Sequence, residues 1–395
     1  MAQEEDIWTV KRCMDWTIGF LERNGEERPR LAAEWLLCAA MDMKRIDLYL
    51  NLDRPMSEEE RAYVRSGLQR RRKGEPLQYI IGETSFRTLE LFCEPGVLIP
   101  RPETELLVEV VLSYLDHEVL GGPAALAARR TRTELPWNAE VERAREAERA
   151  AQRERAANGA DTAGEAADLE DVAAEAALES APAEAALGVE AVGVQRDADA
   201  LGAASTPDAT GEAAAVPTPH RARVLEVGCG TGCISLSLAT ERAGLVTCVA
   251  TDIEPRAVAL AQRNRTRAQV DAAAVDIREG DLVAPVRPEE YGTFDVLVSN
   301  PPYVPSSVVD TLTREVRAFE PRLALDGGTD GLDIFRRLLD EVPRMLRPGG
   351  LFACELFETA TEPAAEFCRA AGLVEVRVVP DLATRPRFVV ARRPR

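Results

Sequence analysis

Three short segments of the sequence combine residue types that could do chemistry. The first is Gly-Cys-Gly-Thr-Gly at 228–232, directly after the apolar run Val224–Val227. Glycines in a turn between a strand and a helix let backbone N–H groups approach a ligand closely. The dinucleotide-binding fingerprint requires Gly or Ala at its last position, where this chain has Cys233. Taken alone, the turn is typical of NAD binding, of methyl-donor binding and of a structural turn alike.

The second segment is the apolar run Leu245–Thr251 with the acidic residue Asp252 at its end. A carboxylate at a strand end can accept hydrogen bonds from two ribose hydroxyls, and each hydrogen bond to a charged group contributes about 1.5–3 kcal/mol. The same side chain could instead cap a helix expected over Pro255–Arg265. One residue could do both, so both interpretations stay open.

The third segment is Asn300-Pro301-Pro302-Tyr303, which follows the apolar run Phe294–Ser299. Proline fixes the backbone and has no N–H, so two prolines leave carbonyl groups without a competing donor. Asn300 adds a side-chain carbonyl and Tyr303 a flat ring. This arrangement suits the gripping of a planar NH2 group through both of its hydrogens.

The elements that must position these segments alternate along the chain. Strands are expected at Val224–Val227, Leu245–Thr251, Phe294–Ser299 and Leu351–Glu355, with a closing pair at Val374–Pro380 and Arg387–Arg392. Helices are expected at Gly232–Arg242, Pro255–Arg265 and Asp333–Met345. This order predicts a doubly wound α/β domain with a mainly parallel sheet.

The region before residue 101 has a different character. Apolar residues at helical spacing over Ile7–Glu22 and Leu31–Met43 predict two helices, the second opened by Pro29. Ser57 and Glu60 have the spacing of a capping box for a third helix that runs to Gly74. Residues 77–100 alternate apolar and polar side chains in short runs, as a hairpin does.

Composition excludes several classes of function. The 395 residues carry a formal net charge of −19, which argues against a general phosphate-binding surface. The two histidines, His117 and His220, are far apart, so a histidine base or a zinc site with several imidazoles is nearly excluded. Cys229 and Cys233 have no further ligands nearby and are expected to be small buried residues rather than a metal pair. No metal site is expected.

No targeting or membrane segment stands out. The first residues are acidic, and the longest apolar stretch, Leu31–Met41, is too short to span a bilayer and contains Glu34. The eight cysteines form no C-x-x-C pair. A cytoplasmic protein with reduced thiols is therefore expected.

One tract interrupts the α/β pattern. Residues 121–220 contain 32 alanines and 9 arginines against 19 acids, a net charge of −10. Ordering the backbone costs roughly 1–2 kcal/mol per residue, which so few large apolar side chains do not offset. We expect 118–220 to be a disordered insertion with one nascent polar helix over Asn138–Ala157.

Further motifs narrow the interpretation to a family. Gly74–Gly82 (GEPLQYIIG), Leu98–Glu105 (LIPRPETE) and Phe319–Leu332 (FEPRLALDGGTDGL), together with the glycine turn and the Asn300 tetrad, resemble the class I S-adenosylmethionine-dependent protein-(glutamine-N5) methyltransferases. The similarity is to the HemK/PrmC type that modifies peptide chain release factors. It covers nearly all of the chain outside 118–220.

The resemblance implies a domain plan and a substrate. Residues 1–76 would be a helical domain that docks the substrate and 77–100 a hairpin linker. Residues 101–117 and 221–395 would form a Rossmann-like catalytic domain. The methyl acceptor would be the glutamine of the Gly-Gly-Gln loop of class I release factors. We expect a monomer with no direct nucleic-acid or membrane contact.

The resemblance also implies the site. The cofactor-binding residues would be Gly228, Cys229, Gly230, Thr231, Gly232, Asp252, Leu282 and Asn300. Asn300, Pro301, Pro302 and Tyr303 would bind the substrate; of these, Asn300, Pro301 and Tyr303 would be catalytic. Two departures bear on this site: Phe357 stands where relatives usually have glycine, and Leu282 stands where an aromatic residue often packs near the adenine.

Rival functions remain at this point. The sequence poorly separates a release factor glutamine methyltransferase from a glutamine methyltransferase of a ribosomal protein. An adenine-N6 DNA methyltransferase uses a similar tetrad, but the acidic net charge of this chain argues against that function. An NAD-dependent oxidoreductase would leave Asn300–Tyr303 without a role. A non-catalytic binding module would bind S-adenosylmethionine and methylate nothing.

Overall fold

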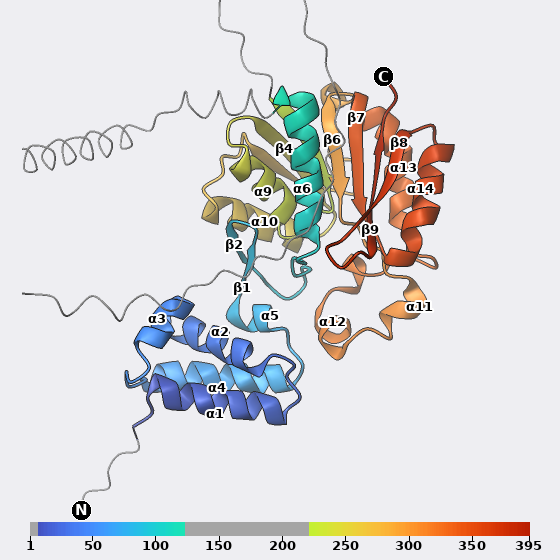
Figure 1. Ribbon diagram of the computed structural model, residues 1–395. Helices are drawn as coiled ribbons and strands as arrows, with labels where there is room; N and C mark the ends of the chain where they lie inside the picture. Colours follow the sequence, from blue (N-terminus) through green and yellow to red (C-terminus); the bar gives the residue numbers. More distant parts are fainter. Residues whose placement is uncertain (1–6, 123–220) are drawn as a thin grey trace, which may run out of the picture. The chain divides into compact units, whose positions relative to one another are not determined.

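The computed structural model describes residues 7–122 and 221–395. The chain starts with five helices, all of which precede the first strand (Figure 1). Their bounds are α1 (Val10–Arg23), α2 (Pro29–Met41), α3 (Arg45–Leu50), α4 (Glu58–Arg72) and α5 (Leu77–Ile81).

The helical region has its own apolar core and its own helix caps. The core contains Leu21, Leu36 and Leu68, from α1, α2 and α4. The predicted capping box of α4 is confirmed, because Ser57 Oγ accepts from the Glu60 N–H at 3.1 Å and Glu60 Oε2 accepts from the Ser57 N–H at 2.8 Å. The helices predicted over 7–22 and 31–43 are present with ends shifted by one to three residues.

The hairpin is shorter than the sequence indicated. Strands β1 (Glu83–Phe86) and β2 (Leu89–Phe92) pair antiparallel, whereas 77–81 forms the short helix α5. That helix ends at Gly82, whose φ of 89° lies in the left-handed region that favours glycine. The buried Asn264 side chain joins the hairpin to the α/β domain that follows, accepting from the Phe92 N–H at 2.7 Å and donating to the Thr231 carbonyl at 2.9 Å.

In the described part of the chain, the α/β domain is built on one seven-stranded sheet with the order β5-β4-β3-β6-β7-β9-β8. Strands β3 to β7 are parallel, and β9 and β8 pair antiparallel at one edge. The bounds are β3 (Ala222–Val227), β4 (Val246–Asp252), β5 (Val275–Glu279), β6 (Phe294–Ser299), β7 (Leu346–Glu355), β8 (Val374–Pro380) and β9 (Pro386–Arg392). The sequence did not predict β5, which has only Val275 and Ile277 as buried apolar residues.

Helices cover both faces of this sheet (Figure 1). On one face α6, α9 and α10 share a core with alternate strand residues such as Val224 and Val296. On the other face α13 and α14 pack on the intervening residues, such as Leu225 and Leu297. The long helices are α6 (Thr104–Tyr114), α9 (Cys233–Glu241), α10 (Pro255–Arg267), α13 (Asp333–Met345) and α14 (Thr361–Ala370). The short ones are the π-helix Leu115–Val119, the 3-10 helices Pro288–Glu290, Arg322–Ala324 and Glu358–Ala360, and α11 (Ser306–Val309) and α12 (Arg314–Phe319). The predicted doubly wound α/β class is confirmed.

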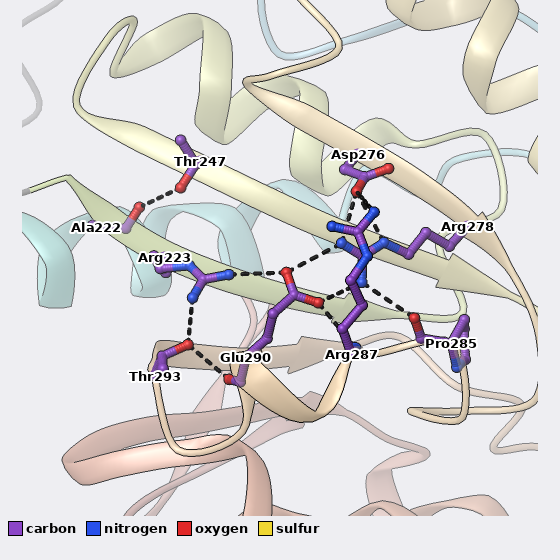
Figure 2. Close-up of polar contacts among 9 residues, drawn as sticks. All are labelled: Ala222, Arg223, Thr247, Asp276, Arg278, Pro285, Arg287, Glu290 and Thr293. Carbon is purple, nitrogen blue, oxygen red and sulfur yellow. Dashed lines mark hydrogen bonds and ion pairs between the residues drawn. The ribbon is translucent and has the colours of Figure 1, made fainter.

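A cluster of charged side chains joins β3, β5 and the segment before β6 (Figure 2). Glu290 is contacted by Arg278 at 2.6 Å and by Arg223 at 3.1 Å, and these contacts hold the pKa of the Glu290 carboxyl at about 2. Arg278 also pairs with Asp276 at 2.7 Å. These ion pairs join β3 and β5 to the segment before β6.

The predicted insertion falls almost entirely outside the described residues, and so does the helix expected over Asn138–Ala157. The insertion cannot begin at 118 as expected, because the helical turn Leu115–Val119 and the buried Leu120 still belong to the core of the α/β domain. After it, Ala222 of β3 belongs to the same core. None of the helices within 7–122 and 221–395 has the length and apolarity needed to cross a membrane.

Because Leu120 and Ala222 enter one core, we expect a variant with 123–220 replaced by a Gly/Ser bridge of about ten residues to fold. Loop-closure entropy grows logarithmically, so the shorter loop should add no more than about 2 kcal/mol to the free energy of unfolding. Urea unfolding tests this, with S-adenosylmethionine binding and methyl transfer as further readouts. A folded variant that had lost either activity, or strong hydrogen-exchange protection across 138–157 in the full chain, would contradict the insertion hypothesis.

Candidate active site

A cavity of about 250 Å³ lies at the carboxyl ends of the parallel strands. Its walls contain each of the three segments singled out in the sequence. The lining residues from these strand ends are Gly228–Thr231, Asp252–Glu254, Gly280–Leu282 and Ser299–Pro302. The segment before α6 closes the cavity with Gly96–Arg101 and Thr104.

The register between β3 and β6 brings two of the segments together. Val227 pairs with Ser299 in the parallel ladder, and Ser299 Oγ donates to the Val227 carbonyl at 2.7 Å. The residues that follow, Gly228 and Asn300, therefore leave the sheet side by side. The strand order reverses between β3 and β6, which is where ligands bind in open α/β sheets.

The glycine turn exposes backbone to the cavity. Gly228, Gly230 and Gly232 have φ values of 72°, 55° and 81°. A Cβ added to Gly228 would meet no atom within 4 Å, and one added to Gly230 would meet only Val97, at 4.0 Å. A Cβ on Gly232 would instead lie 3.2 Å from Ala261 and Leu236. The first two glycines thus leave room for a ligand, while the third allows close packing of α9.

Asp252 fastens this turn to the end of β4. Its Oδ2 accepts from the Gly230 N–H at 2.8 Å, and its Oδ1 accepts from the Glu254 N–H at 2.9 Å. Burial raises the pKa of the Asp252 carboxyl, and the two backbone hydrogen bonds oppose that rise. The alternative that Asp252 caps the next helix is wrong, because Glu254 is the N-cap of α10 and accepts from the Arg256 N–H.

Leu282 lies on the cavity wall in an unusual backbone conformation. Its φ is 48°, the left-handed region that residues other than glycine rarely adopt. Its carbonyl accepts from Thr251 Oγ1 at 2.7 Å, which holds this turn against β4. The side chain is half-buried against the core on the α13 face, so it offers the cavity an apolar contact.

Asn300 has one end of its amide anchored and the other free of protein partners. Its Nδ2 donates to Thr104 Oγ1 at 3.0 Å. Its Oδ1 is buried and has no hydrogen-bond partner among the described residues. An unpaired buried acceptor costs about 1–3 kcal/mol, so its presence in a cavity indicates that a ligand supplies the donor.

Glu355 connects Thr104 to the last residue of the tetrad. Thr104 Oγ1 donates to Glu355 Oε2 at 2.8 Å, and Tyr303 Oη donates to Glu355 Oε1 at 3.2 Å. Glu355 is 1% exposed, and burial raises its pKa to about 7. Tyr303 packs against the core of the α13 face and does not line the cavity. Its expected contact with the substrate therefore stays a prediction.

The backbone of two glycines, Gly327 and Gly331, lies directly against Pro302 and Tyr303 of the tetrad. A Cβ on Gly327 would lie 2.7 Å from the Pro302 carbonyl oxygen and 2.8 Å from Tyr303 Cα. One on Gly331 would overlap the Tyr303 carbonyl. The backbone at Gly327 and Gly331 therefore packs directly on Pro302–Tyr303, which leaves no room for a side chain at these two positions.

Phe357, one of the two departures from the usual pattern, adopts a backbone conformation that does not require glycine. Phe357 has φ −65° and ψ 141°, an ordinary extended conformation that needs no glycine, and its side chain packs against the α13-face core. The strand before it keeps its register with β9 up to Glu355.

The sequence interpretation did not single out three buried polar side chains at or beside the cavity: Thr104, Glu226 and Glu355. Thr104 lies within the motif Leu98–Glu105, but a motif does not tell which member faces the site. The neighbouring Glu105 instead accepts from the Arg87 N–H of the hairpin. Arg101 lines the cavity and forms an ion pair with the buried Glu320, at 2.6 Å, which fixes the wall after α12.

Glu226 is the buried carboxyl below the glycine turn. It is 1% exposed, lines the cavity and accepts from the Ser235 N–H of α9 at 2.9 Å. Burial raises its pKa to about 8, although the Ser235 hydrogen bond favours the charged form.

Known proteins resemble this chain along nearly its whole length. The PrmC N-terminal domain model matches residues 13–82 and the Methyltransferase small domain model matches residues 213–327. A release factor glutamine methyltransferase of Geobacter sulfurreducens is 33% identical over 90% of this chain and 87% of its own length. One from Koribacter versatilis is 30% identical over 98% of this chain and 99% of its own length. The chain belongs to the release factor glutamine methyltransferase family.

Membership of the release factor glutamine methyltransferase family settles the class of cofactor. The chain is an S-adenosylmethionine-dependent class I methyltransferase, so the NAD-dependent alternative falls away. Among solved structures, a methyltransferase from Pyrococcus furiosus is 22% identical, covers 45% of this chain and 77% of its own, and gives a TM-score of 0.34. That value is too low to support an argument.

The residues present fit this cofactor. Gly228 and Gly230 leave backbone open to the cavity where side chains would fill it. Asp252 presents carboxylate oxygens at the next strand end, and Leu282 supplies an apolar wall. The acidic groups at the cavity, Asp252, Glu254 and Asp281, suit a ligand with hydroxyl groups and positive charge.

We predict that Glu226→Gln removes a pH dependence of stability. Between its ordinary pKa of 4.5 and the folded value of about 8, the native state holds more protons on Glu226 than the unfolded state does. The free energy of unfolding therefore falls by up to about 1.4 kcal/mol per pH unit as pH rises through this range. Glutamine keeps an acceptor for the Ser235 N–H but cannot ionise.

Urea unfolding from about pH 5 to about pH 8 tests this. The stability of Glu226→Gln relative to the wild type should increase steadily with pH. The same substitution at the exposed Glu279, at the end of β5, is the matched control. A stability difference between Glu226→Gln and the wild type that does not change with pH would contradict the raised pKa of Glu226.

Proposed function

We propose that this chain methylates the side-chain amide nitrogen of the glutamine in the Gly-Gly-Gln loop of class I peptide chain release factors. The observation that carries the proposal is the buried Asn300 Oδ1 at the cavity, which has no partner among the described residues. A carboxamide NH2 group is the donor that such an acceptor requires. The names of the relatives point to the same acceptor.

Two acceptors would hold the substrate NH2 group. Asn300 Oδ1 takes one hydrogen, and the backbone carbonyl of Pro301 takes the other. Of the two proline carbonyls, that of Pro302 faces Gly327 at the back of the tetrad, which supports the assignment to Pro301. Proline at 301 and 302 removes backbone N–H donors that would compete for these oxygens.

The chemistry follows from the nature of an amide. Its nitrogen is a poor nucleophile because the lone pair is delocalised into the carbonyl. Bound S-adenosylmethionine supplies the methyl group on a positively charged sulfur. Asn300 and Pro301 would orient the amide nitrogen, and such positioning can supply about 7–11 kcal/mol of barrier lowering. Their carbonyl dipoles favour the positive charge that grows on nitrogen, and the proton then leaves to water.

The same proposal assigns the remaining residues of the site. The turn Gly228, Cys229, Gly230, Thr231 and Gly232 would hold the cofactor with Asp252, Leu282 and Asn300. Pro302 and Tyr303 would complete the substrate-binding tetrad. Arg71 of α4 contacts Glu315 of α12 at 2.8 Å, which links the helical region to the helix just before the cavity residues Pro321 and Leu323. This contact supports 1–76 as the docking domain for a protein substrate and 77–100 as its linker.

The proposal places the enzyme in the cytoplasm, as a monomer that acts on a protein. The acidic net charge of −19 disfavours a nucleic-acid substrate. An adenine-N6 DNA methyltransferase and a glutamine methyltransferase of a ribosomal protein are the alternatives to be tested beside it.

Cofactor binding gives the first prediction from this assignment. Asp252→Ala should weaken S-adenosylmethionine binding by about 2–4 kcal/mol, the loss of one or two hydrogen bonds to a charged group. Gly230→Val should abolish binding, because its side chain would project into the cavity from a φ of 55°.

Isothermal titration calorimetry measures both effects. Gly244→Val is the matched control, since Gly244 also has positive φ, 74°, but faces open space away from the cavity. This control should lose stability and keep its affinity. Tighter binding of NAD than of S-adenosylhomocysteine would overturn the assignment of this turn and Asp252 to the cofactor.

The function itself is tested with labelled S-adenosylmethionine and purified release factors, ribosomal proteins and DNA. Mass spectrometry should find one added methyl group on the glutamine of the Gly-Gly-Gln peptide. Methylation of a ribosomal protein or of adenine, with the release factor unmodified, would refute the proposed substrate.

In the same assay Asn300→Ala should lower turnover by about 10²–10³-fold, the scale for losing one preorganised polar group. S-adenosylmethionine affinity should change much less. Asn300→Asp should also fail, because a carboxylate has no NH2 group for Thr104 and would attract a proton instead of orienting the amide. Near-normal turnover of Asn300→Ala would contradict the grip on the NH2 group.

A further inference from the structure

The direction in which the Asn300 amide points decides whether it can hold a substrate NH2 group. The two ends of a carboxamide are similar in size but opposite in hydrogen bonding, since the oxygen accepts and the nitrogen donates. Turning the amide over would aim a donor at the substrate, which also donates. In the structure Nδ2 contacts Thr104 Oγ1 at 3.0 Å and Oδ1 faces away from that hydroxyl without a partner.

The Thr104 hydroxyl has only one proton to give. That proton is directed at Glu355 Oε2, at 2.8 Å. With its proton engaged, Thr104 Oγ1 can only accept, and the neighbour it accepts from must be an N–H. Asn300 can supply that N–H only when Oδ1 points away from Thr104.

Glu355 sets the direction of this chain of hydrogen bonds. A carboxylate accepts at both oxygens and donates from neither. Oε2 accepts from Thr104, and Oε1 accepts from Tyr303 Oη at 3.2 Å. Because Glu355 is 1% exposed, water does not compete for these positions.

We propose that Thr104 and Glu355 are positioning residues that lock the Asn300 amide with Oδ1 toward the substrate. Neither side chain has to touch the reacting atoms. We call the hydrogen bonds that connect Asn300, Thr104 and Glu355 the relay. The relay joins the start of α6, the end of β6 and the end of β7, and residues 104 and 355 are 251 positions apart in the sequence. The inference rests on the proposed function, because it explains how the NH2-gripping group is oriented.

The central experiment compares Thr104→Val with Thr104→Ser in the full chain. Valine has nearly the shape of threonine but no hydroxyl, so Asn300 loses the acceptor that distinguishes its two ends. We expect kcat on the release factor to fall about 10- to 100-fold, as when a positioning partner is lost. The KM for the release factor and the calorimetric affinity for S-adenosylmethionine should stay within about two-fold. Serine restores the hydroxyl and should restore kcat.

Thr361→Val is the matched control. Thr361 is also a fully buried threonine whose hydroxyl donates, in its case to the Glu358 carbonyl at 3.1 Å, but it lies on α14 away from the tetrad. Its kcat should equal that of the wild type. A fall in kcat for this control as large as for Thr104→Val would mean that kcat reports core damage, which would overturn the relay.

A pH profile separates orientation from packing. Burial raises the pKa of Glu355 to about 7, the hydrogen bonds from Thr104 and Tyr303 and the charge of Arg387 oppose this rise, and Glu103 adds to it. Cys233 faces the same carboxyl from α9. The wild-type kcat should therefore increase as pH rises through about 7 and the carboxylate forms. Glu355→Gln cannot ionise and should lack this step.

The outcomes discriminate between the two proposals. A wild-type enzyme that leaves the release factor unmethylated refutes the proposed function and the relay with it. Wild-type methylation together with an unchanged kcat in Thr104→Val refutes the relay alone. The relay is also overturned if serine fails to restore kcat while S-adenosylmethionine still binds, or if Glu355→Gln keeps the wild-type pH step.

Discussion

The pairing register of β3 with β6 is the constraint on which the active site depends. Val227 lies opposite Ser299, and the hydroxyl of Ser299 fixes this pairing by donating to the Val227 carbonyl. From this level the glycine turn leaves one strand and the Asn300 tetrad leaves the other. A slip of one residue in either strand would turn its side chains to the opposite face of the sheet and separate the cofactor turn from the substrate grip. The buried apolar faces of both strands, with α6 and α9 on one side and α13 on the other, make such a slip costly.

Around this pair, a few buried polar side chains hold the loops that the sheet itself cannot position. Asp252 ties the glycine turn to β4 through the Gly230 N–H, and Asn264 ties the carbonyl of Thr231 to the backbone of β2. The hairpin and the cofactor turn are therefore located by the same helix, α10. On the opposite wall of the cavity, Arg101 Nη2 contacts both carboxylate oxygens of Glu320, and this ion pair fixes the segment after α12.

The sequence predicted those parts of the molecule whose signal is local. Phe294–Ser299 and Asp333–Met345 were predicted with the bounds that the structure has, because each combines a clear apolar pattern with distinct ends. The glycine turn, Asp252 and Asn300 were found because their chemistry follows from residue type and from position after a strand. The strand β5 was missed because charged residues alternate with its two apolar ones. The roles of Thr104, Glu226 and Glu355 could not be derived, since each depends on a partner brought close only by the fold. The positions of Leu282 and Phe357 show the converse, because residues that differ from the usual pattern are accommodated by an ordinary or locally supported backbone.

The direction of α6 determines at which end of the sheet the chain leaves the fold after Val119. The helix begins with Thr104 against Asn300, and its π-helical extension ends at Val119. From Thr104 to Val119 the helix has sixteen residues, which corresponds to a length of about 24 Å. Asn300 therefore lies at one end of this helix, and the chain continues toward residue 123 from the other end. The chain re-enters at Ala222, at the amino end of β3, which is also the end remote from the cavity. Any change of length or sequence at this junction therefore enters the fold at the edge of the sheet opposite the cavity.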